Sequence, residues 1–387
     1  MMRKLASILT LVTALVVGMG GSPAFAACGW SVVSSPSPAR FDNLLLGVGA
    51  SSATDAWAVG ESTSTRHAPA QTLAEHWDGT SWSAVASQDP GTGTNILSNV
   101  AAISPTDAWA VGGYDPAVHE PSRTLAEHWD GTAWATATTP NVGPRDNTLQ
   151  DVVAVSSTDV WAVGWFLDPN DPTLLDRTLV QHWDGSTWSI VPSPSPGDDV
   201  NVLTRVVATS ASNLWATGWY SNQADQVAHA LALHWNGAKW KVVPTIDQGT
   251  TSNVFTDISA ASANDVWAVG WSFSSGGQGD ATLIEHWDGS AWSLSPHPAV
   301  GTNDVFGGVA ALSAGKVLAV GTTFDGTTTS TLVERWNGTS WAVDPTPTPA
   351  QGVPSNLALI PATRQMWAAG GLTTGGLTSK TLIERYC

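Results

Sequence analysis

The chain has 387 residues and a formal net charge of −17, although charged residues make up only 12% of it. Binding to nucleic-acid phosphates rests on clustered Lys and Arg, so this composition excludes nucleic acid as an expected partner. The same acidity disfavours adhesion to anionic membrane surfaces.

The N-terminus has the layout of a cleavable secretory signal. Arg3 and Lys4 precede an apolar stretch that ends at Val17, and small residues follow it. The stretch is too short to span a membrane, and no later stretch is long and apolar enough to do so. We therefore expect a signal peptide at 1–27 and a single mature domain at 28–387, secreted, monomeric and not inserted in a membrane.

The two cysteines, Cys28 and Cys387, stand at the two extremes of the mature chain. In an exported protein an even number of cysteines predicts a disulfide. The alternative is a lipid anchor at Cys28. Phe25 fits that alternative poorly, because a Leu usually stands three residues before a lipid-modified cysteine, and Cys387 would then have no role.

Three series of Trp residues run through the chain at intervals of about fifty residues, which indicates a repeat architecture. The first series lies in frames such as Ala-Trp-Ala-Val-Gly, the second precedes an Asp-Gly or Asn-Gly pair, and the third, apart from its first member, follows such a pair. The first series comprises Trp57, Trp109, Trp161, Trp215, Trp267 and Trp367, with Leu318 in the sixth place. The second comprises Trp77, Trp129, Trp183, Trp235, Trp287 and Trp336, with Tyr386 in the seventh place. The third comprises Trp30, Trp82, Trp134, Trp188, Trp240, Trp292 and Trp341.

The two ends of the chain belong to one repeat. Trp30 stands before any complete repeat, and the last repeat stops just after Tyr386. One end therefore completes the repeat that the other begins, which in β-propellers removes exposed sheet edges. The sequence predicts an all-β fold, a seven-bladed β-propeller of four-stranded blades whose last blade is completed by the N-terminal strand.

Each repeat is predicted to form four short strands, which in the second repeat are Ile96–Ile103, Ala108–Gly112, Thr124–Trp129 and Ala133–Ala137. The Asp-Gly and Asn-Gly pairs supply the backbone angles of a tight turn between the third and fourth strands. The turns after the first and third strands are nearly constant among the repeats, whereas the other two connections vary. Because alternate connections of a meander emerge on one face, we expect the variable loops to share the face that binds ligands.

Two segments resemble known propeller families. The sequence AWAVGG at 108–113, followed by 124–134, resembles the kelch repeat, in which a hydrophobic strand ends in Gly-Gly and is followed by an aromatic-Asp step and a Trp. This resemblance covers essentially all of 28–387. The hairpin WDGSAW at 287–292 is similar to that of bacterial seven-bladed propeller lectins, which implies carbohydrate binding.

Kelch-like folds also include galactose oxidases, which use copper and a Tyr cross-linked to a Cys. The chain has only three tyrosines, and its cysteines are terminal, so we expect neither that chemistry nor any other metal or cofactor. No zinc-ligand pair, nucleophile elbow or phosphate-binding loop is recognisable in the sequence.

Two polar series recur once per repeat. A His or Arg on the third strand is preceded in most repeats by a Glu, and its distance from the axis favours contacts between blades over a shared metal ion. An Asn or Asp near the start of the first strand either caps a turn or forms a polar collar that contacts a ligand. The first series comprises His76, His128, His182, His234, His286, Arg335 and Arg385, with Glu75, Glu127, Glu285, Glu334 and Glu384 before them. The second comprises Asn43, Asn95, Asn147, Asn201, Asn253, Asp304 and Asn356.

Repeats three to five depart from the pattern where the second strand ends. Trp165, Trp219 and Trp271 stand there, beside Phe166 and Tyr220. Aromatic rings on an exposed face stack on sugars or pack against a protein partner. The alternative is that these rings pack between blades.

Charged residues occupy the inner strands of the same three repeats. They are Asp151, Arg205 and Asp257, at positions where the first and sixth repeats have Gly47 and Gly308. These side chains either contribute polar contacts to a ligand site or form a salt-bridge network within the scaffold. Together with the aromatic residues they mark one sector as the expected binding site.

We favour a non-catalytic binding protein that recognises carbohydrate, as on a cell-surface glycan, or a cell-surface protein through this sector. One alternative is an enzyme acting on polysaccharide, with Asp151 and Asp257 as paired carboxylates. Another is a protein-interaction scaffold.

Overall fold

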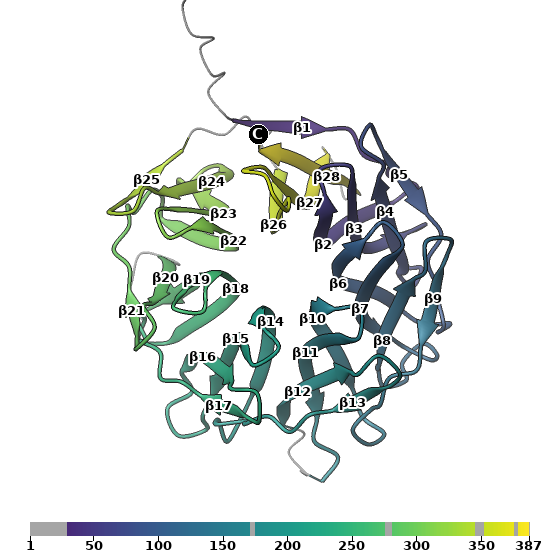
Figure 1. Cartoon of the computed structure of the whole chain (residues 1–387), viewed down its shortest axis with the longest axis horizontal. Helices are drawn as coiled ribbons and strands as arrows, with labels where there is room; N and C mark the ends of the chain where they lie inside the picture. The colour runs from purple at the N-terminus through teal and green to yellow at the C-terminus, as the bar shows by residue number, and fades with distance from the viewer. Residues whose placement is uncertain (1–28, 171–174, 275–280, 345–351, 375–377, 387) are drawn as a thin grey trace, which may run out of the picture.

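The computed structural model describes residues 29–170, 175–274, 281–344, 352–374 and 378–386. Over these residues the chain forms 28 strands, arranged as a closed ring of sheets about a central axis (Figure 1). In each blade the first strand lies nearest the axis and the fourth lies at the rim. The predicted all-β, seven-bladed β-propeller is confirmed.

The strands follow the repeats in chain order. Blade 1 consists of β2 (Asp42–Ser52), β3 (Asp55–Thr63), β4 (Gln71–Trp77) and β5 (Trp82–Val85), and blade 2 of β6 (Asn95–Ser104), β7 (Asp107–Tyr114), β8 (Arg123–Trp129) and β9 (Trp134–Ala137). Blade 3 consists of β10 (Asn147–Ser156), β11 (Asp159–Leu167), β12 (Asp176–Trp183) and β13 (Trp188–Ile190), and blade 4 of β14 (Asn201–Ser210), β15 (Asn213–Ser221), β16 (Ala228–Trp235) and β17 (Trp240–Val242). Blade 5 consists of β18 (Ser252–Ser262), β19 (Asp265–Phe273), β20 (Ala281–Trp287) and β21 (Trp292–Leu294), and blade 6 of β22 (Asn303–Ser313), β23 (Lys316–Phe324), β24 (Thr329–Trp336) and β25 (Trp341–Val343). Blade 7 consists of β26 (Gly352–Leu359), β27 (Met366–Thr374), β28 (Thr378–Tyr386) and β1 (Trp30–Val33).

The last blade closes the ring as predicted. β1 pairs antiparallel with β28, and Trp30 lies directly across from Tyr386. The N-terminal strand therefore takes the rim position of blade 7, beside blade 1 (Figure 1). Cys28 and Cys387, predicted to form a disulfide at this junction, lie outside the described residues, as does the predicted signal peptide.

Trp residues from adjacent blades hold the interfaces together. Trp57 of blade 1 packs against Trp129 and Trp134 of blade 2, with both pairs of ring centroids 4.8 Å apart. The ring of His76 lies on the same indole at a centroid distance of 4.5 Å. Trp57 has no exposed surface. A first-series Trp thus contacts one second-series and one third-series Trp of the next blade. Because each blade interface needs one residue of each kind, the three series recur with the same spacing. The same arrangement joins Trp109 to Trp183 and Trp188, Trp161 to Trp235 and Trp240, Trp215 to Trp287 and Trp292, Trp267 to Trp336 and Trp341, and Trp367 to Trp77 and Trp82.

The Asp-Gly pairs form the predicted hairpin turns. Asp78 accepts hydrogen bonds from the Thr80 hydroxyl and from the backbone N–H groups of Thr80 and Ser81. These bonds lower the pKa of Asp78 to about 2. Gly79 has a φ of 95°, a conformation that a side chain disfavours. The acid is therefore held by its own turn.

Every inner strand carries a β-bulge at the same place. In blade 3 the pairing shifts between Leu149 and Asp151. The bulge changes the direction in which the side chain of Asp151 leaves the strand. The equivalent shift lies between Leu45 and Gly47 in blade 1. The bulged position recurs as Gly47, Asn99, Asp151, Arg205, Asp257, Gly308 and Asn356. These residues form a ring around the axis, which we call the bulge ring.

Candidate functional site

The variable connections lie together on one face of the disc. They are the loops between second and third strands, such as 115–122 in blade 2, and the linkers between blades, such as 138–146. We call this surface the variable-loop face. Inner strands begin at it and run towards the opposite face, where the constant turns lie.

The predicted aromatic residues lie at the variable-loop face without touching one another. Trp165, Trp219 and Trp271 are each partly buried, and none of their rings contacts another aromatic ring among the described residues. Trp165 shares one side of β11 with Trp161 and Val163, which pack against blade 4. Each of the three Trp residues therefore sits at its own blade interface, with part of its surface exposed.

Phe166 and Tyr220 lie on the opposite side of their strands from the neighbouring Trp. Phe166 packs against the cluster that joins blades 2 and 3, next to Trp109 and Leu149. Tyr220 stacks on His229 with ring centroids 5.0 Å apart. The structure thus divides the five predicted aromatic residues between several blade interfaces and does not assemble them into one continuous platform.

Asp151, Arg205 and Asp257 belong to the bulge ring, nearer the middle of the inner strands than the Trp residues. Asp151 and Asp257 have only 4% and 6% of their surface exposed. Arg205 lies between them in the ring, and its Nε is 3.6 Å from Asp257 Oδ1. Burial raises the pKa of Asp257 to about 7, although Arg205 opposes the shift. Burial likewise raises the pKa of Asp151, again against the effect of Arg205.

Both carboxyl groups of this charged set bind neighbouring blades. Asp151 Oδ2 accepts a hydrogen bond of 2.7 Å from the backbone N–H of Val206 in blade 4. Asp257 Oδ2 accepts one of the same length from Val309 in blade 6. The amide of Asn99 in blade 2 donates to Asp151 Oδ1 at 2.5 Å. These bonds give the network a structural role in joining blades, and they occupy the oxygens that paired-carboxylate catalysis would need.

Most of the Asn series caps the linkers between blades. Asn201 accepts a hydrogen bond of 2.7 Å from the backbone N–H of Gly197 and donates one of 2.9 Å to its carbonyl. Asn356 does not belong to this series, because it occupies the bulge ring and accepts a hydrogen bond of 3.1 Å from the backbone N–H of Val48 in blade 1. The sequence alignment of the last repeat was therefore wrong at this residue, since a bulge cannot be read from residue spacing.

The His and Glu series serve the scaffold. His182 Nε2 lies 2.8 Å from Asp159 at the start of the preceding strand. Glu127 is fully buried and accepts a backbone hydrogen bond from Gln88 in the linker from blade 1. Burial raises the pKa of Glu127 to about 8. Among the described residues no group of three or more His, Cys, Asp or Glu side chains is placed to hold a metal ion.

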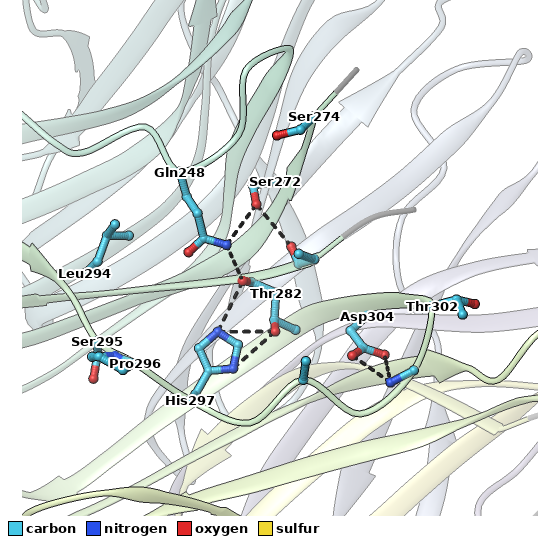
Figure 2. Close-up of a pocket in the computed structure, with 13 residues that line it drawn as sticks. Gln248, Ser272, Ser274, Thr282, Leu294, Ser295, Pro296, His297, Thr302 and Asp304 are labelled. Atoms are coloured by element: carbon cyan, nitrogen blue, oxygen red, sulfur yellow. Dashed lines mark hydrogen bonds between the residues drawn. The ribbon is translucent and has the colours of Figure 1, made fainter. Parts of the chain in front are cut away.

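A pocket of about 560 Å³ opens on the variable-loop face at the junction of blades 5 and 6 (Figure 2). Ser272 and Thr282 line it from blade 5, and His297 and Asp304 from the linker and first strand of blade 6. Gln248 reaches in from the preceding linker and donates a hydrogen bond of 3.2 Å to the Ser272 hydroxyl. The lining is rich in hydroxyl groups and also offers an amide, an imidazole and a carboxylate, together with short apolar side chains.

At this pocket blade 5 has a small residue where blades 2, 3 and 4 have rings. Ser272 pairs with Asn253 as Phe166 pairs with Asn147 and Tyr220 with Asn201. Phe166 and Tyr220 fill the space between strand and linker in blades 3 and 4. The hydroxymethyl group of Ser272 leaves that space open.

His297 is a second departure from the repeat at this pocket. The corresponding residue in blade 3 is Ser193, whose hydroxyl lies 2.8 Å from the Thr178 hydroxyl. In blade 5, His297 lies 3.3 Å from the equivalent Thr282 hydroxyl. The larger imidazole reaches further and approaches Glu334 of blade 6 at 3.6 Å.

The surroundings of His297 favour the protonated form of its ring. Nε2 lies 3.2 Å from the carbonyl oxygen of Thr282, and Nδ1 lies 3.2 Å from that of Pro298. Carbonyl oxygens only accept hydrogen bonds, so these two contacts favour a proton, and hence a positive charge, on the ring. Burial disfavours this charge, but the contact with Glu334 outweighs it and raises the pKa of His297. His297 therefore lines the pocket with its ring held by Thr282, Pro298 and Glu334.

Sequence reasoning missed this pocket, although the signal was present. A position-by-position comparison of repeats shows Ser272 where three preceding blades have Tyr114, Phe166 and Tyr220, and His297 where other blades have Ser or Thr. This signal is an aromatic residue absent from the repeat, whereas Trp165, Trp219 and Trp271 are aromatic residues added to it.

No protein-family model matches the sequence, and neither does any curated protein. Similar solved structures include YCF48 bound to D1 peptide and YCF48 from Cyanidioschyzon merolae, each 13% identical with a TM-score of 0.55 over 92% of this chain. The alignments cover 96% and 98% of those chains. The WD40 β-propeller domain of Doa1 is 11% identical, with a TM-score of 0.57 over 93% of this chain and 97% of that one. At these identities the likeness establishes the propeller fold.

No helix long and apolar enough to cross a membrane occurs in the part of the chain that the structure describes.

Proposed function

We propose that this protein is a secreted binding scaffold that recognises carbohydrate on its variable-loop face, with the pocket between blades 5 and 6 as the principal site. The observation that carries the proposal is the pocket itself. Its volume of about 560 Å³ lies within the range of about 300–1,000 Å³ that small-molecule sites occupy. Its hydroxyl and amide groups and the carboxylate of Asp304 provide hydrogen-bond donors and acceptors of the kind that a sugar requires.

The partly exposed Trp residues extend this proposed surface. Trp271 belongs to the same blade as the pocket, and Trp219 belongs to the preceding blade. An exposed edge or face of an indole packs against the apolar face of a pyranose ring. A longer glycan that occupies the pocket would meet these side chains as it extends across the variable-loop face.

The test compares glycan-array binding of the wild type with that of Ser272→Phe. This substitution places in blade 5 the ring that blade 3 carries at Phe166, so it fills the pocket with a side chain that the scaffold already accommodates elsewhere. Ser62→Phe makes the same change at the equivalent position of blade 1 and serves as the control. We expect the Ser62→Phe variant to bind the same glycans as the wild type with similar affinity. The Ser272→Phe variant is expected to bind them at least tenfold more weakly.

Two results would overturn the proposal. One is an array on which the wild type binds no glycan. The other is binding that survives in Ser272→Phe and also in Trp219→Ala, because the ligand would then contact neither the pocket nor the extended surface.

A polypeptide partner is the second candidate. It is favoured by the solved structure of YCF48 bound to D1 peptide, a propeller that covers 92% of this chain. Screening a random peptide library against the wild type and the Ser272→Phe variant distinguishes the two candidates, since a peptide site elsewhere on the face would be unaffected by that substitution.

A further inference from the structure

A second and smaller cavity lies on the variable-loop face at the interface of blades 2 and 3. Its volume is about 250 Å³. Ile96, Ser98 and Gly113 line it from blade 2, and Thr148 and Gln150 from blade 3. Asp115 lies at the start of the loop after β7 and also lines it. Blade 2 lies across the central axis from the junction of blades 5 and 6, so this cavity is separate from the pocket of Figure 2 (Figure 1). We call it the blade 2 slot.

The slot occupies a place that an indole occupies in the next three blades. Gly113 pairs with Ile96 in the register in which Trp165 pairs with Thr148 and Trp219 with Val202. A Cβ atom built on Gly113 would lie 2.9 Å from the Thr148 hydroxyl oxygen, and its next neighbours lie 3.5 Å or more away. A side chain at this position therefore requires a small shift of Thr148 and meets no other close contact.

The glycine of blade 7 at the same position shows that an absent side chain does not by itself create a slot. A Cβ on Gly371 would meet Leu44 Cδ1 of blade 1 at 2.7 Å. Leu44 holds the position in blade 1 that Thr148 holds in blade 3, and its longer side chain covers Gly371. The slot in blade 2 therefore depends on the combination of Gly113 and the short Thr148.

The walls of the slot combine aliphatic and polar groups. Ile96 and Leu46 supply apolar surface, and Ser98, Thr148 and Gln150 supply hydroxyl and amide groups. The Asp115 side chain is partly exposed, and its carboxylate accepts no hydrogen bond from any residue that the structure describes. The slot thus offers a cavity of mixed apolar and polar lining with an available acceptor at Asp115.

We propose that the blade 2 slot binds an aromatic side chain of a polypeptide partner, with a Trp or Tyr ring inserted where Trp165 inserts in blade 3. The scaffold already holds indoles in this position in three blades, so the shape required of the occupant is known. The Asp115 carboxylate accepts the ring N–H or O–H. Buried aromatic anchors in such pockets dominate the energetics of many protein interfaces.

The charge of the protein adds a feature of the partner. The chain carries a formal net charge of −17, and Asp115 has no basic residue bound to it among the described residues. A partner that presents Lys or Arg beside its aromatic anchor would therefore associate faster than a neutral one. This inference concerns a different site from the proposed carbohydrate pocket and does not depend on it.

The test uses N-acetyl-tryptophanamide as the probe and saturation-transfer NMR as the readout. The wild type and the Ser272→Phe variant are expected to bind the probe, because the blade 5 pocket is not involved. Gly113→Trp fills the slot with the protein's own indole and is expected to reduce probe binding at least tenfold. Gly113→Ile fills only the base of the slot. If the Trp variant does not fold, the Ile variant replaces it and is likewise expected to reduce probe binding.

A gain-of-function variant makes the test two-sided. Trp165→Gly together with Leu167→Asp supplies the equivalent slot and acceptor in blade 3, and in combination with Gly113→Trp it is expected to restore probe binding. The proposal would be overturned if the wild type bound N-acetylglucosamine but not N-acetyl-tryptophanamide, and if Gly113→Trp abolished the sugar binding. So would binding of N-acetyl-tryptophanamide that is equal in the wild type and the Gly113→Trp variant.

Discussion

The indole of Trp30 lies against the phenol ring of Tyr386, with ring centroids 5.4 Å apart and the planes inclined at 55°. The two residues face each other across the last hydrogen-bonded strand pair of blade 7. Both belong to the cluster that includes Leu318 of blade 6, the residue that replaces a first-series Trp. The interface of blades 6 and 7 is thus built with one Trp, one Tyr and one Leu, whereas other interfaces have three Trp residues.

Trp30→Ala is expected to open this interface. Trp30 is 93% buried, with only 7% of its surface exposed, and it forms the rim strand together with three other residues. Removing a buried Trp side chain costs about 3–5 kcal/mol of unfolding free energy. Urea unfolding monitored by circular dichroism measures the loss. Val32→Ala on the same strand is the control, because Val32 is 50% exposed and its truncation should leave the midpoint nearly unchanged. Equal effects of the two substitutions would contradict the role of Trp30 in closure.

Gly47→Ala and Gly308→Ala form a matched pair within the bulge ring. A Cβ on Gly47 would lie 2.3 Å from Asn99 Oδ1 and 2.5 Å from the backbone Cα of Asn99, so relief requires movement between blades 1 and 2. A Cβ on Gly308 would have its nearest neighbour at 3.2 Å. We expect Gly47→Ala to cost at least about 2 kcal/mol and Gly308→Ala under about 1 kcal/mol, as judged by overpacking in other cores. Thermal unfolding of both variants measures the difference, and equal melting temperatures would show that the ring adjusts more freely than its geometry suggests.

Arg205→Met is expected to destabilise the bulge ring in a pH-dependent way. The substitution leaves Asp151 and Asp257 buried without the cation between them, and breaking a buried ion pair in this way costs about 3–5 kcal/mol. Because burial already raises the pKa of Asp257 to about 7, protonation relieves part of the cost in acid. Urea unfolding at about pH 5 and about pH 8 should therefore show the larger loss at the higher pH.

The triple variant Asp151→Asn, Arg205→Met, Asp257→Asn provides the control for this network. It removes the buried charges together and should recover much of the stability lost in Arg205→Met. A triple variant that is no more stable than Arg205→Met would mean that packing of the Arg205 side chain, and not its charge, is what the ring requires.

The fold could be predicted from the sequence because three separate series of Trp residues show the same repeat. Each Trp series packs at a defined place in the blade interface. Trp30 at the N-terminus supplies the fourth strand that the last repeat lacks. The predicted strands of blade 2 differ from β6, β7, β8 and β9 only by a residue or two at their ends. Short apolar runs between turn residues are a local signal, so they suffice to place strands such as β7, which is buried along most of its length.

The site could be predicted only in part, because it depends on contacts between repeats. The sequence identifies Asp151 and Arg205 as departures from the repeat, but only the bulge and the bond from Val206 to Asp151 show how this network joins blades. Asn356 was assigned to the wrong series for the same reason. The pocket at Ser272 and the slot at Gly113 arise where a side chain is smaller than in the other blades, and an absent side chain is easily overlooked in a search for chemically active residues.

The stability of the whole protein is expected to fall as the pH rises from about 4.5 to about 8. Burial raises the pKa values of Glu75, Glu127 and Glu285 to about 8, well above the value of 4.5 in the unfolded chain. In this range the folded state holds protons that the unfolded chain has released, so rising pH favours unfolding. His297 acts in the same direction, because its raised pKa gives stability below pH 6.5 that is lost as the pH passes the folded value.

Glu75 offers the sharpest test of this pH dependence. Its carboxyl group has no exposed surface and accepts no hydrogen bond from the residues that the structure describes. Glu75→Gln replaces it with an uncharged group of nearly equal size. The variant should match the wild type in urea unfolding at about pH 5, where Glu75 is protonated in the folded state, and should be the more stable of the two at about pH 8.5. A wild-type midpoint that stays constant or rises between these pH values would contradict the raised pKa values of the buried acids, because a folded state that holds extra protons loses stability as the pH rises.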